Sequence, residues 1–467
     1  MHRILITLLL AAFSTSVNSQ TYQVVVFSPS SGFNETRGTG LYELQRVGAA
    51  RISGAPQPED SHAVLWIGDS QTPVDLNPAG FDFSIAADTD GLRQVGTAYR
   101  PNVPSAIIRV AALWSGTAGS FVPLCALPYC GNSVAYSVAG DQQVGFTDNS
   151  TMCTPHCTPF PVLHAALWRG TPQSYVDLHP VGIGCERSFA FDTDGTQQVG
   201  YGTFPGSSHD TRALLWFGTS GSLIDLSPAA FQISQANAVR NGVQAGYGQN
   251  YIFGGISPPT ALVWRGSAAS VVALGPGVIE DTNGSTHVGT QGEGPSNHAF
   301  RWDGDTGEGF DLHSLLPPGV YSNSGAEQID SAGNIIGWAQ RVDTYYLEAV
   351  LWRVVAAVPN SSPDVWLSSP RPYSTHGLSS FVTLTGHATD VDGSITSVEF
   401  IVDGQPVGSG SMIEPDKKGD NVLAFEMLWK AAQAGRYRVQ ARATDNLGAV
   451  SYSRPSVIYV VSSASVE

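Results

Sequence analysis

Five cysteines are the residues best suited to chemistry, and they fall in one stretch of the chain: Cys125, Cys130, Cys153, Cys157 and Cys185. Cysteines grouped in this way in an exported protein are typical of disulfide bonds. Because their number is odd, we predict two bridges and one unpaired thiol, and the sequence leaves the pairing open. A zinc site formed by Cys153, His156 and Cys157 is the alternative, although it lacks a second ligand pair at zinc-site spacing.

Acidic residues in the C-terminal part suggest a second kind of chemistry. Asp390, Asp392 and Asp445 follow strand-like segments, and their oxygens are candidate ligands for calcium, the one cofactor that the sequence suggests. The earlier Asp-x-Asp-Gly segments at 88–91 and 192–195 are instead interpreted as hairpin turns, because they are short and lack the further oxygen ligands of a calcium loop.

Other catalytic signals are weak. The sequence has no Gly-x-Ser-x-Gly elbow, His-Glu-x-x-His motif or phosphate loop, and its three lysines lie at 417, 418 and 430. His62, His164 and His298 recur in one repeat position, so we interpret them as packing and hydrogen-bonding residues. The expected loops also carry acids without a spacing that pairs them: Glu59, Asp60, Asp148, Glu186, Asp210 and Glu293. We therefore assign no catalytic residue.

Two sequence elements repeat along the chain and indicate the strands that must position the residues named above. An apolar segment that ends in tryptophan occurs seven times, at Trp66, Trp114, Trp168, Trp216, Trp264, Trp302 and Trp352. A small or β-branched residue followed by glycine also occurs seven times, with the glycine at Gly48, Gly96, Gly145, Gly200, Gly246, Gly289 and Gly337. Asp-Leu pairs and segments that open with Ser84, Ser133, Ser188 or Ser234 lie between them. Each period therefore holds four strand-length pieces.

Tight turns set the order of these strands. Asp-Gly and Asn-Gly pairs, as at 241–242 and 283–284, precede the glycine element and are strong hairpin signals. Seven units of four antiparallel strands predict an all-β, seven-bladed β-propeller over residues 20–353. An open solenoid is the alternative. The chain starts with a strand at 23–27 and the last repeat stops at 349–352 without its own fourth strand, so we predict that 23–27 completes the last blade and closes the ring.

These repeats resemble the bacterial extracellular HAF repeats. The likeness rests on His62-Ala-Val-Leu-Trp66, His164-Ala-Ala-Leu-Trp168, His298-Ala-Phe-Arg-Trp302 and the glycine element, and it covers about residues 22–353. Repeats two and five depart from the pattern because Pro123 and Ala273 replace the aspartate of Asp-Leu. The family is defined by sequence more than by activity, so the resemblance implies an extracellular repeat protein.

A second domain follows a linker at 354–363. Residues 364–467 contain alternating strands at 381–385, 397–402, 435–441 and 456–461, which predict an Ig-like β-sandwich. Ala388-Thr-Asp-Val-Asp-Gly393 and Ala443-Thr-Asp-Asn-Leu-Gly448 resemble bacterial Ig-like modules. Such modules imply a spacer or a carbohydrate or protein contact.

The composition limits the location and the partners. Residues 1–19 read as a secretory signal peptide, and no later stretch reaches membrane-spanning length, so we expect a secreted or periplasmic monomer. A net charge of -16 argues against nucleic acid as a partner. We therefore expect a non-catalytic binding or surface-associated protein with an extracellular carbohydrate or protein ligand. The alternatives are a propeller-type polysaccharide hydrolase or lyase and a cell-envelope scaffold.

Overall fold

A computed structural model describes residues 21–462 with gaps at 31, 56–59, 103–105, 126–131, 150–161, 206–209, 293–296, 356–359 and 414–421. The predicted signal peptide at 1–19 lies outside the described residues. The chain divides into two compact units, one of Thr21–Val355 and one that begins at Ala356. Regular structure in the described residues is β-strand and short 3-10 helix, and none of these helices is long or apolar enough to cross a membrane.

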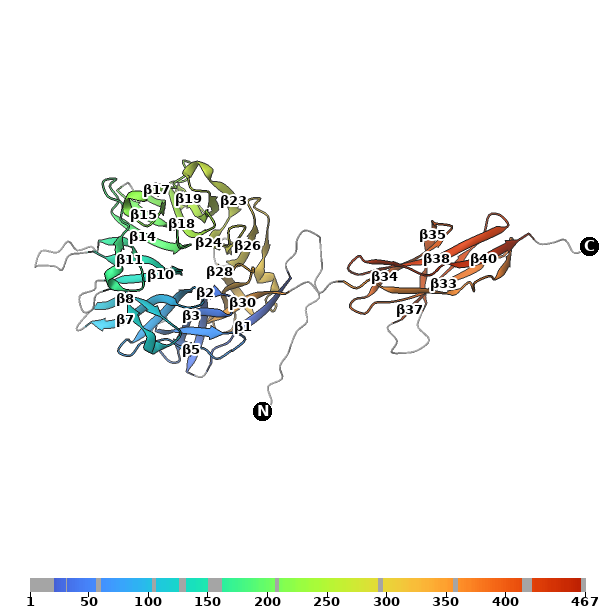
Figure 1. Cartoon of the computed structure of the whole chain (residues 1–467), viewed down its shortest axis with the longest axis horizontal. Coiled ribbons are helices and arrows are strands. Elements are labelled where there is room, and N and C mark those ends of the chain that lie inside the picture. Colours follow the sequence, from blue (N-terminus) through green and yellow to red (C-terminus); the bar gives the residue numbers. More distant parts are fainter. Residues whose placement is uncertain are drawn as a thin grey trace, which may run out of the picture. The chain divides into compact units, whose positions relative to one another are not determined.

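The first unit contains seven four-stranded antiparallel sheets, numbered here 1 to 7 in chain order (Figure 1). Sheets 1 to 3 consist of β2 (Phe33–Tyr42), β3 (Gln45–Ile52), β4 (Ser61–Ile67) and β5 (Val74–Asp75); β6 (Phe83–Thr89), β7 (Gln94–Asn102), β8 (Ala106–Trp114) and β9 (Val122–Pro123); and β10 (Ser133–Ala139), β11 (Gln142–Asp148), β12 (Leu163–Trp168) and β13 (Val176–Asp177). Sheets 4 to 6 consist of β14 (Arg187–Thr193), β15 (Gln198–Phe204), β16 (Asp210–Trp216) and β17 (Ile224–Asp225); β18 (Ile233–Arg240), β19 (Val243–Gln249), β22 (Thr260–Trp264) and β23 (Val272–Pro276); and β24 (Val278–Thr282), β25 (Thr286–Gln291), β26 (His298–Asp303) and β27 (Gly309–Asp311).

Sheet 7 joins the two ends of this unit. It consists of β28 (Tyr321–Ile329), β29 (Ile335–Arg341), β30 (Leu347–Val355) and, as its fourth strand, β1 (Thr21–Phe27). Val24 pairs with Trp352 and Phe27 pairs with Ala349. The predicted pairing of 23–27 with 349–352 is therefore present, and it covers the edge that β30 would otherwise expose.

Shorter elements lie between the sheet strands. A hairpin of β20 (Tyr251–Ile252) and β21 (Gly255–Ile256) is inserted between β19 and β22 of sheet 5. The 3-10 helices are η1 (Ala118–Ser120), η2 (Pro172–Ser174), η3 (Ser220–Ser222), η4 (Ala268–Ser270) and η5 (Leu312–Leu315).

The repeated tryptophans form the contacts between sheets. All seven are at most 1% exposed. Trp216 of sheet 4, for example, packs with Val144 and Leu167 of sheet 3, and Trp66 of sheet 1 packs with Phe27 and Leu351 of sheet 7. The tryptophans are therefore structural, and the hydrophobic core of the unit lies between neighbouring sheets.

A β-bulge explains the repeated glycine. The first strand of every sheet carries a bulge opposite the glycine element, as between Ala86 and Asp88 in β6. A β-carbon on Gly96 would stand 2.0 Å from the carbonyl oxygen of Ile85, and the other six glycines meet a carbonyl at 1.9 or 2.0 Å. Only glycine fits this position, because any side chain would collide with the facing backbone.

The same bulged strands lie side by side through the unit. The first strands of successive sheets are in contact, from β2 and β6 through to β24 and β28, and β28 is in contact with β2 (Figure 1). Residues at and beside each bulge therefore face the residues at and beside the bulges of both neighbours.

A recurring hydrogen bond joins most neighbouring sheets at their third and first strands. The backbone N–H of an alanine donates to a hydroxyl in the next sheet over 2.9–3.0 Å, from Ala63 to Ser84, Ala111 to Ser133, Ala165 to Ser188, Ala213 to Ser234, Ala299 to Ser324 and Ala349 to Thr36. We call these six bonds the hydroxyl latches. The last of them joins sheet 7 to sheet 1.

The second unit is a two-sheet sandwich. One sheet contains β31 (Asp364–Ser369), β33 (Val382–Thr389), β37 (Leu423–Trp429) and β36 (Ser411–Ile413). The other contains β32 (Thr375–Gly377), β40 (Ser456–Val461), β38 (Gly435–Asp445), β34 (Ile395–Val402) and β35 (Gln405–Ser409), with β39 (Val450–Tyr452) paired to β38. Leu384 and Phe425 of the first sheet pack with Phe400 and Ala441 of the second, which forms a separate core.

Candidate functional site

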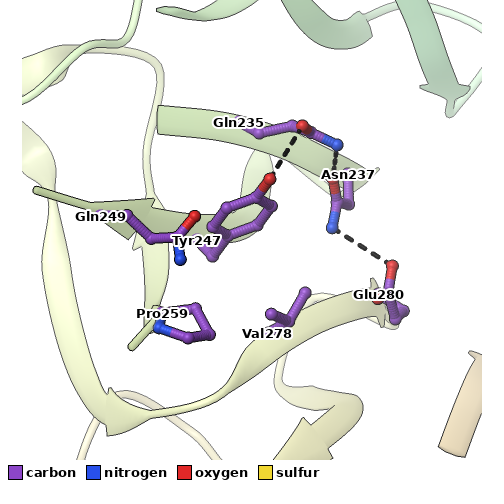
Figure 2. A pocket seen from close by; sticks show the side chains of 7 residues that line it. All are labelled: Gln235, Asn237, Tyr247, Gln249, Pro259, Val278 and Glu280. Atoms are coloured by element: carbon purple, nitrogen blue, oxygen red, sulfur yellow. Dashed lines mark hydrogen bonds between the residues drawn. The ribbon is translucent and has the colours of Figure 1, made fainter. Parts of the chain in front are cut away.

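A polar pocket opens where sheets 5 and 6 meet. It has a volume of about 340 Å³, and its lining residues are Gln235, Asn237, Tyr247, Gln249, Pro259, Val278 and Glu280 (Figure 2). This junction lacks the hydroxyl latch. Ala261, which stands where the other alanines donate, is paired with Gly275 because β23 is longer than its counterparts. Gly277, immediately before β24, takes the position where the other repeats provide a hydroxyl.

A chain of hydrogen bonds runs along the pocket wall (Figure 2). The Tyr247 hydroxyl donates to Gln235 Oε1 over 3.1 Å, and Gln235 Nε2 donates to Asn237 Oδ1 over 2.9 Å. Asn237 Nδ2 then donates to Glu280 Oε2 over 3.2 Å. The amide, hydroxyl and carboxyl groups together provide both hydrogen-bond donors and acceptors. A ligand with many hydroxyl groups needs both kinds of partner.

A second hollow of about 370 Å³ adjoins the first and shares Pro259 and Val278 with it. Its wall includes Ile256, the last residue of the β20–β21 hairpin. The turn of this hairpin carries Phe253, whose side chain is fully exposed. The pocket therefore continues toward an insertion that presents an aromatic ring to solvent.

Two glutamates occupy the same bulge position in neighbouring sheets. Glu280 in β24 and Glu327 in β28 are the residues that the bulges leave out of the strand pairing. Glu327 Oε1 accepts hydrogen bonds from Arg37 Nη2 and Trp338 Nε1, both over 2.6 Å. Burial and the charge of Glu327 raise the pKa of Glu280 to about 7, although Arg37 acts in the opposite direction. The two carboxyl groups therefore have different environments, a pattern shared by acid and base pairs in enzymes.

Three aspartates that follow a bulge are buried between sheets. Asp88 accepts the N–H of Val138, Asp192 accepts that of Val239, and Asp281 accepts that of Ile329, over 2.7–2.9 Å. Each bond crosses to the next sheet. The sequence analysis interpreted the segments that begin at Asp88 and Asp192 as hairpin turns. The residue that stabilises the first turn is the next aspartate, since Asp90 Oδ1 accepts the N–H groups of Leu92 and Arg93.

Burial also changes the acidity of these aspartates. It raises the pKa of Asp192 to about 6 and that of Asp281 to about 8, and the guanidinium of Arg240 offsets part of the increase in both. The pKa of Asp88 is raised for the same reason, while hydrogen bonds from Val138, Gln328 and Ser137 act against the increase. The three side chains are buried and each accepts an N–H from the next sheet, so we interpret them as structural residues that connect neighbouring sheets.

The repeated histidines are structural and lie in different sheets. The Nδ1 atoms of His62, His164 and His298 lie 2.7–2.9 Å from carboxylate oxygens of Asp75, Asp177 and Asp311. Each pair joins the third strand of a sheet to its fourth. The interpretation as packing and hydrogen-bonding residues is confirmed.

His164 and His298 also stack on further histidines, at ring distances of 3.9 and 4.0 Å from His179 and His313. His179 and His313 in turn contact the latch hydroxyls of Ser188 and Ser324 over 2.9 and 2.8 Å. This second pair of histidines was not singled out from the sequence, where Asn77 and Ser227 take the equivalent place two residues after the aspartate.

The cysteine group is only partly described. Cys130, Cys153, His156 and Cys157 lie outside the described residues, and so does the zinc hypothesis that rests on three of them. Cys125 is disulfide-bonded. Cys185 is a free thiol and must be removed from the disulfide candidates. Its Sγ–H donates to the carbonyl of Arg187 over 3.1 Å, and burial raises its pKa to about 11, so it is also a poor nucleophile.

The loop acids are distributed over several sheets. Glu59 and Glu293 lie outside the described residues. Asp60 precedes β4 of sheet 1, and Asp148 ends β11 of sheet 3. Glu186 precedes β14 and Asp210 begins β16, both in sheet 4. The acid that lines the pocket is Glu280, and Glu327 lies in the next sheet, sheet 7. The sequence analysis did not single out either residue, because the bulges that place them cannot be recognised from the sequence.

The calcium candidates lie at one end of the sandwich. Asp390 and Asp392 follow β33, Asp445 ends β38, and the Asp392 and Asp445 carboxylates are close enough to raise the pKa of Asp390, an effect to which burial contributes most. Within the described ranges, no three His, Cys, Asp or Glu side chains are placed to hold a metal ion. Asp445 is already engaged, since its Oδ1 accepts the N–H groups of Leu447 and Ala449.

Comparisons with known proteins support the second unit only. Residues 363–415 match the family model for a bacterial Ig domain, so this part of the chain is Ig-like, as the sequence predicted. No curated protein matches the chain.

Among solved structures, the chain is similar to fibronectin(III)-like modules of Clostridium thermocellum CbhA, with 16% identity and a TM-score of 0.18 over 21% of this chain and 94% of the other. It is also similar to an oligogalacturonate lyase in complex with manganese, with 9% identity and a TM-score of 0.40 over 72% and 97%. A third similar structure is the tricorn protease, with 10% identity and a TM-score of 0.36 over 90% and 44%. Likenesses at these scores carry no argument about fold or function.

Proposed function

We propose that residues 21–355 form a closed seven-bladed β-propeller of HAF-type repeats, with each sheet as one blade. The supporting observations are the seven sheets in chain order, the contact of β28 with β2 and the completion of sheet 7 by β1. The bond from Ala349 to Thr36 repeats at the closing junction the latch that joins the other blades. An open solenoid would leave the first and last sheets without these contacts.

We propose further that the chain is an exported, non-catalytic binding protein whose pocket between sheets 5 and 6 takes a polyhydroxylated ligand, such as part of a carbohydrate. The observation that carries this proposal is the hydrogen-bonded wall of Tyr247, Gln235, Asn237 and Glu280 in a pocket that forms where the latch is replaced. The Ig-like unit then acts as a spacer or a second contact.

Retention on immobilised polysaccharides tests this function. The protein lacking residues 1–19 is passed over a panel of insoluble and immobilised glycans, and release of reducing ends is measured in the same samples. We expect retention on at least one glycan without release of products. Release of products contradicts the non-catalytic assignment, and a panel without retention favours the scaffold alternative.

The second candidate function is hydrolysis of a polysaccharide, and the Glu280–Glu327 pair favours it. A glycosidase uses one protonated and one ionised carboxyl group, and the raised pKa of Glu280 beside an ion-paired Glu327 fits those two roles. If the protein releases reducing ends, Glu280→Gln must abolish that release while glycan retention persists. Undiminished activity of Glu280→Gln excludes this pair.

We propose that the disulfides lie among Cys125, Cys130, Cys153 and Cys157, which leaves Cys185 as the unpaired thiol. The support is the free state of Cys185 and the bonded state of Cys125. Peptide mapping without reduction then finds Cys185 alkylated in the unfolded protein and the other four in bridges. A bridged Cys185, or zinc retained after dialysis, contradicts this assignment.

A further inference from the structure

One hairpin is inserted into the repeat beside the polar pocket. β20 and β21 lie between β19 and β22 of sheet 5, and within the described residues no other sheet of the first unit has a paired insertion between its second and third strands. The apolar core that the repeats share therefore does not depend on this hairpin. An insertion that adjoins a pocket is placed to contact whatever the pocket binds.

The hairpin presents apolar side chains to solvent. Phe253 at its turn is fully exposed, and Ile252 and Ile256 on either side of the turn are more than half exposed. None of the three belongs to the apolar cores on the two sides of sheet 5. Exposed apolar groups that lie together mark binding sites, because their removal from water by a partner is favourable.

Hydrogen bonds fix the base of the hairpin. The Asn250 N–H donates to Ser257 Oγ over 3.0 Å, and the Ser257 N–H donates to the Asn250 carbonyl over 2.8 Å. The Tyr251 N–H also donates to Oε1 of Gln232, which precedes β18, over 2.8 Å. The exposed ring is therefore carried by a short segment whose base is held in place, so that little conformational entropy is lost when a ligand contacts it.

The base of the hairpin is also bonded to the wall of the polar pocket. Gln249 lines this pocket, and its Nε2 donates to the carbonyl of Ser257, which lines the second hollow, over 2.9 Å. Pro259 and Val278, both drawn in Figure 2, line the two hollows together. The hollows measure about 340 and 370 Å³, and each lies near the lower end of the range for ligand sites, about 300–1,000 Å³. A ligand larger than one hollow therefore extends into the other and toward the hairpin.

The chemistry of this surface changes along its length. The pocket end provides amide, hydroxyl and carboxyl groups, the second hollow combines the hydroxyl of Thr290 with apolar Pro258 and Ile256, and the hairpin ends in the ring of Phe253. A sugar has hydroxyl groups around its edge and C–H groups on its faces, and such C–H groups fit the negative face of an aromatic ring. A chain of linked sugars can use all three parts, whereas a single sugar in the pocket leaves the hairpin without a contact.

The walls of both hollows disfavour an acidic ligand. Glu280 is the one charged side chain among their described lining residues, and no lysine or arginine is present there to balance a carboxylate or a sulfate. The chain as a whole has a net charge of -16, so its field also repels anions. These charges favour a neutral ligand.

We propose that the ligand is a neutral, linear oligosaccharide with one sugar in the polar pocket and further sugars that cross the second hollow and stack on Phe253. This inference rests on the proposed carbohydrate-binding function and adds the ligand class and the role of the hairpin. Affinity then depends on the length of the sugar chain, because only a longer chain reaches the ring.

Calorimetric titration of the protein lacking residues 1–19 tests the ligand class. The probes are neutral gluco-, xylo- and manno-oligosaccharides from disaccharide to hexasaccharide, with oligogalacturonides as acidic counterparts. For at least one neutral series we expect affinity to rise at least about tenfold with length and then to become constant, since each sugar that is bound adds contact area until the surface is covered. Equal affinity at all lengths contradicts the proposal. Binding of the acidic series alone contradicts it as well but leaves the proposed binding function intact, whereas retention on no glycan contradicts both.

Matched variants test the hairpin. Phe253→Ala is expected to weaken binding of the hexasaccharide at least about fivefold and to leave that of the disaccharide unchanged, and Phe253→Tyr, which keeps an aromatic ring, is expected to bind like the parent. Phe217→Ala removes a partly exposed phenylalanine that follows β16 in sheet 4 and is expected to change neither affinity. Circular dichroism checks that each variant is folded. Unchanged hexasaccharide binding by Phe253→Ala contradicts the proposal, and if this variant instead loses a self-association that light scattering detects in the parent, the hairpin contacts a second copy of the chain and the proposal is wrong.

Discussion

The junction between sheets 5 and 6 differs from the six other junctions in the first unit. The six are joined by the hydroxyl latches, whereas this one has a longer β23, Gly277 in the position of the latch hydroxyl, and a pocket. The apolar contacts are alike: Trp302 packs with Ala245 and Val263 here, as Trp216 packs with Val144 and Leu167 at a latched junction. The apolar core is thus the same at both kinds of junction and the polar contacts differ, and the pocket forms where the latch is replaced by longer strand pairing within sheet 5.

Removal of β1 is expected to have the largest effect. Deletion of residues 21–27 leaves β30 as an exposed edge strand and removes the fully buried Phe27 from the contact between sheets 7 and 1. We expect the truncated protein to associate in light scattering and to be cut faster by protease than the parent. Equal protease resistance in a monomeric truncated protein contradicts the role of β1 in closing sheet 7.

Tryptophan substitutions compare the cores of the two kinds of junction. Trp216→Ala and Trp302→Ala each remove a fully buried ring, and we expect each to lower the free energy of unfolding by about 3–5 kcal/mol. Denaturant titration measures both. If Trp302→Ala costs far less than Trp216→Ala, the pocket junction has a weaker core and differs in more than its polar edge.

A hydroxyl substitution tests the latch between sheets 7 and 1. The Thr36 hydroxyl accepts the N–H of Ala349 and also donates to the carbonyl of Phe27 over 2.6 Å. Thr36→Ala removes both bonds, and we expect a loss of about 1–3 kcal/mol relative to Thr36→Ser, which keeps the hydroxyl. Thermal or denaturant unfolding of the two variants gives the difference. Equal stability of the two would mean that the latch does not distinguish the six junctions from the seventh.

The buried aspartates make the stability of the sheets depend on pH. Their folded-state pKa values, about 6 for Asp192 and about 8 for Asp281, lie above the unfolded value, so the native state binds protons more tightly. Their contribution is fully present below about pH 4 and is lost as the pH rises through 6 to 8. We expect stability to fall by about 1 kcal/mol or more from pH 5 to pH 8, and Asp281→Asn to flatten this profile. A profile that rises with pH over this range contradicts the assignment.

The sequence predicted the parts of the first unit that repeat. Tryptophan and glycine positions, turn signals and the pairing of 23–27 with 349–352 all depend on local pattern and on counting strands. The pocket could not be predicted in this way, because it depends on how far β23 extends and on which residues a bulge displaces. Asp88 and Asp192 could not be interpreted correctly for the same reason. Their place beside an Asp-Gly turn indicates turn residues, whereas the packing of the sheets shows that each accepts a backbone N–H from the next sheet. The cysteines were the strongest functional signal in the sequence and lie around sheet 3, whereas the described polar pocket lies between sheets 5 and 6.

The most direct test of the pocket is to fill it. Phe189 occupies in β14 the position that Val278 occupies in β24 and Ile85 in β6, so the repeat tolerates phenylalanine there. Val278→Phe introduces a ring into the wall of the pocket, and Ile85→Phe makes the matched change at a latched junction. With a glycan retained by the parent, we predict at least about tenfold weaker binding by Val278→Phe and unchanged binding by Ile85→Phe, since a ring in the pocket removes the space for the ligand. Unchanged binding by Val278→Phe, or an equal loss in both variants, would contradict the assignment of this junction as the binding site.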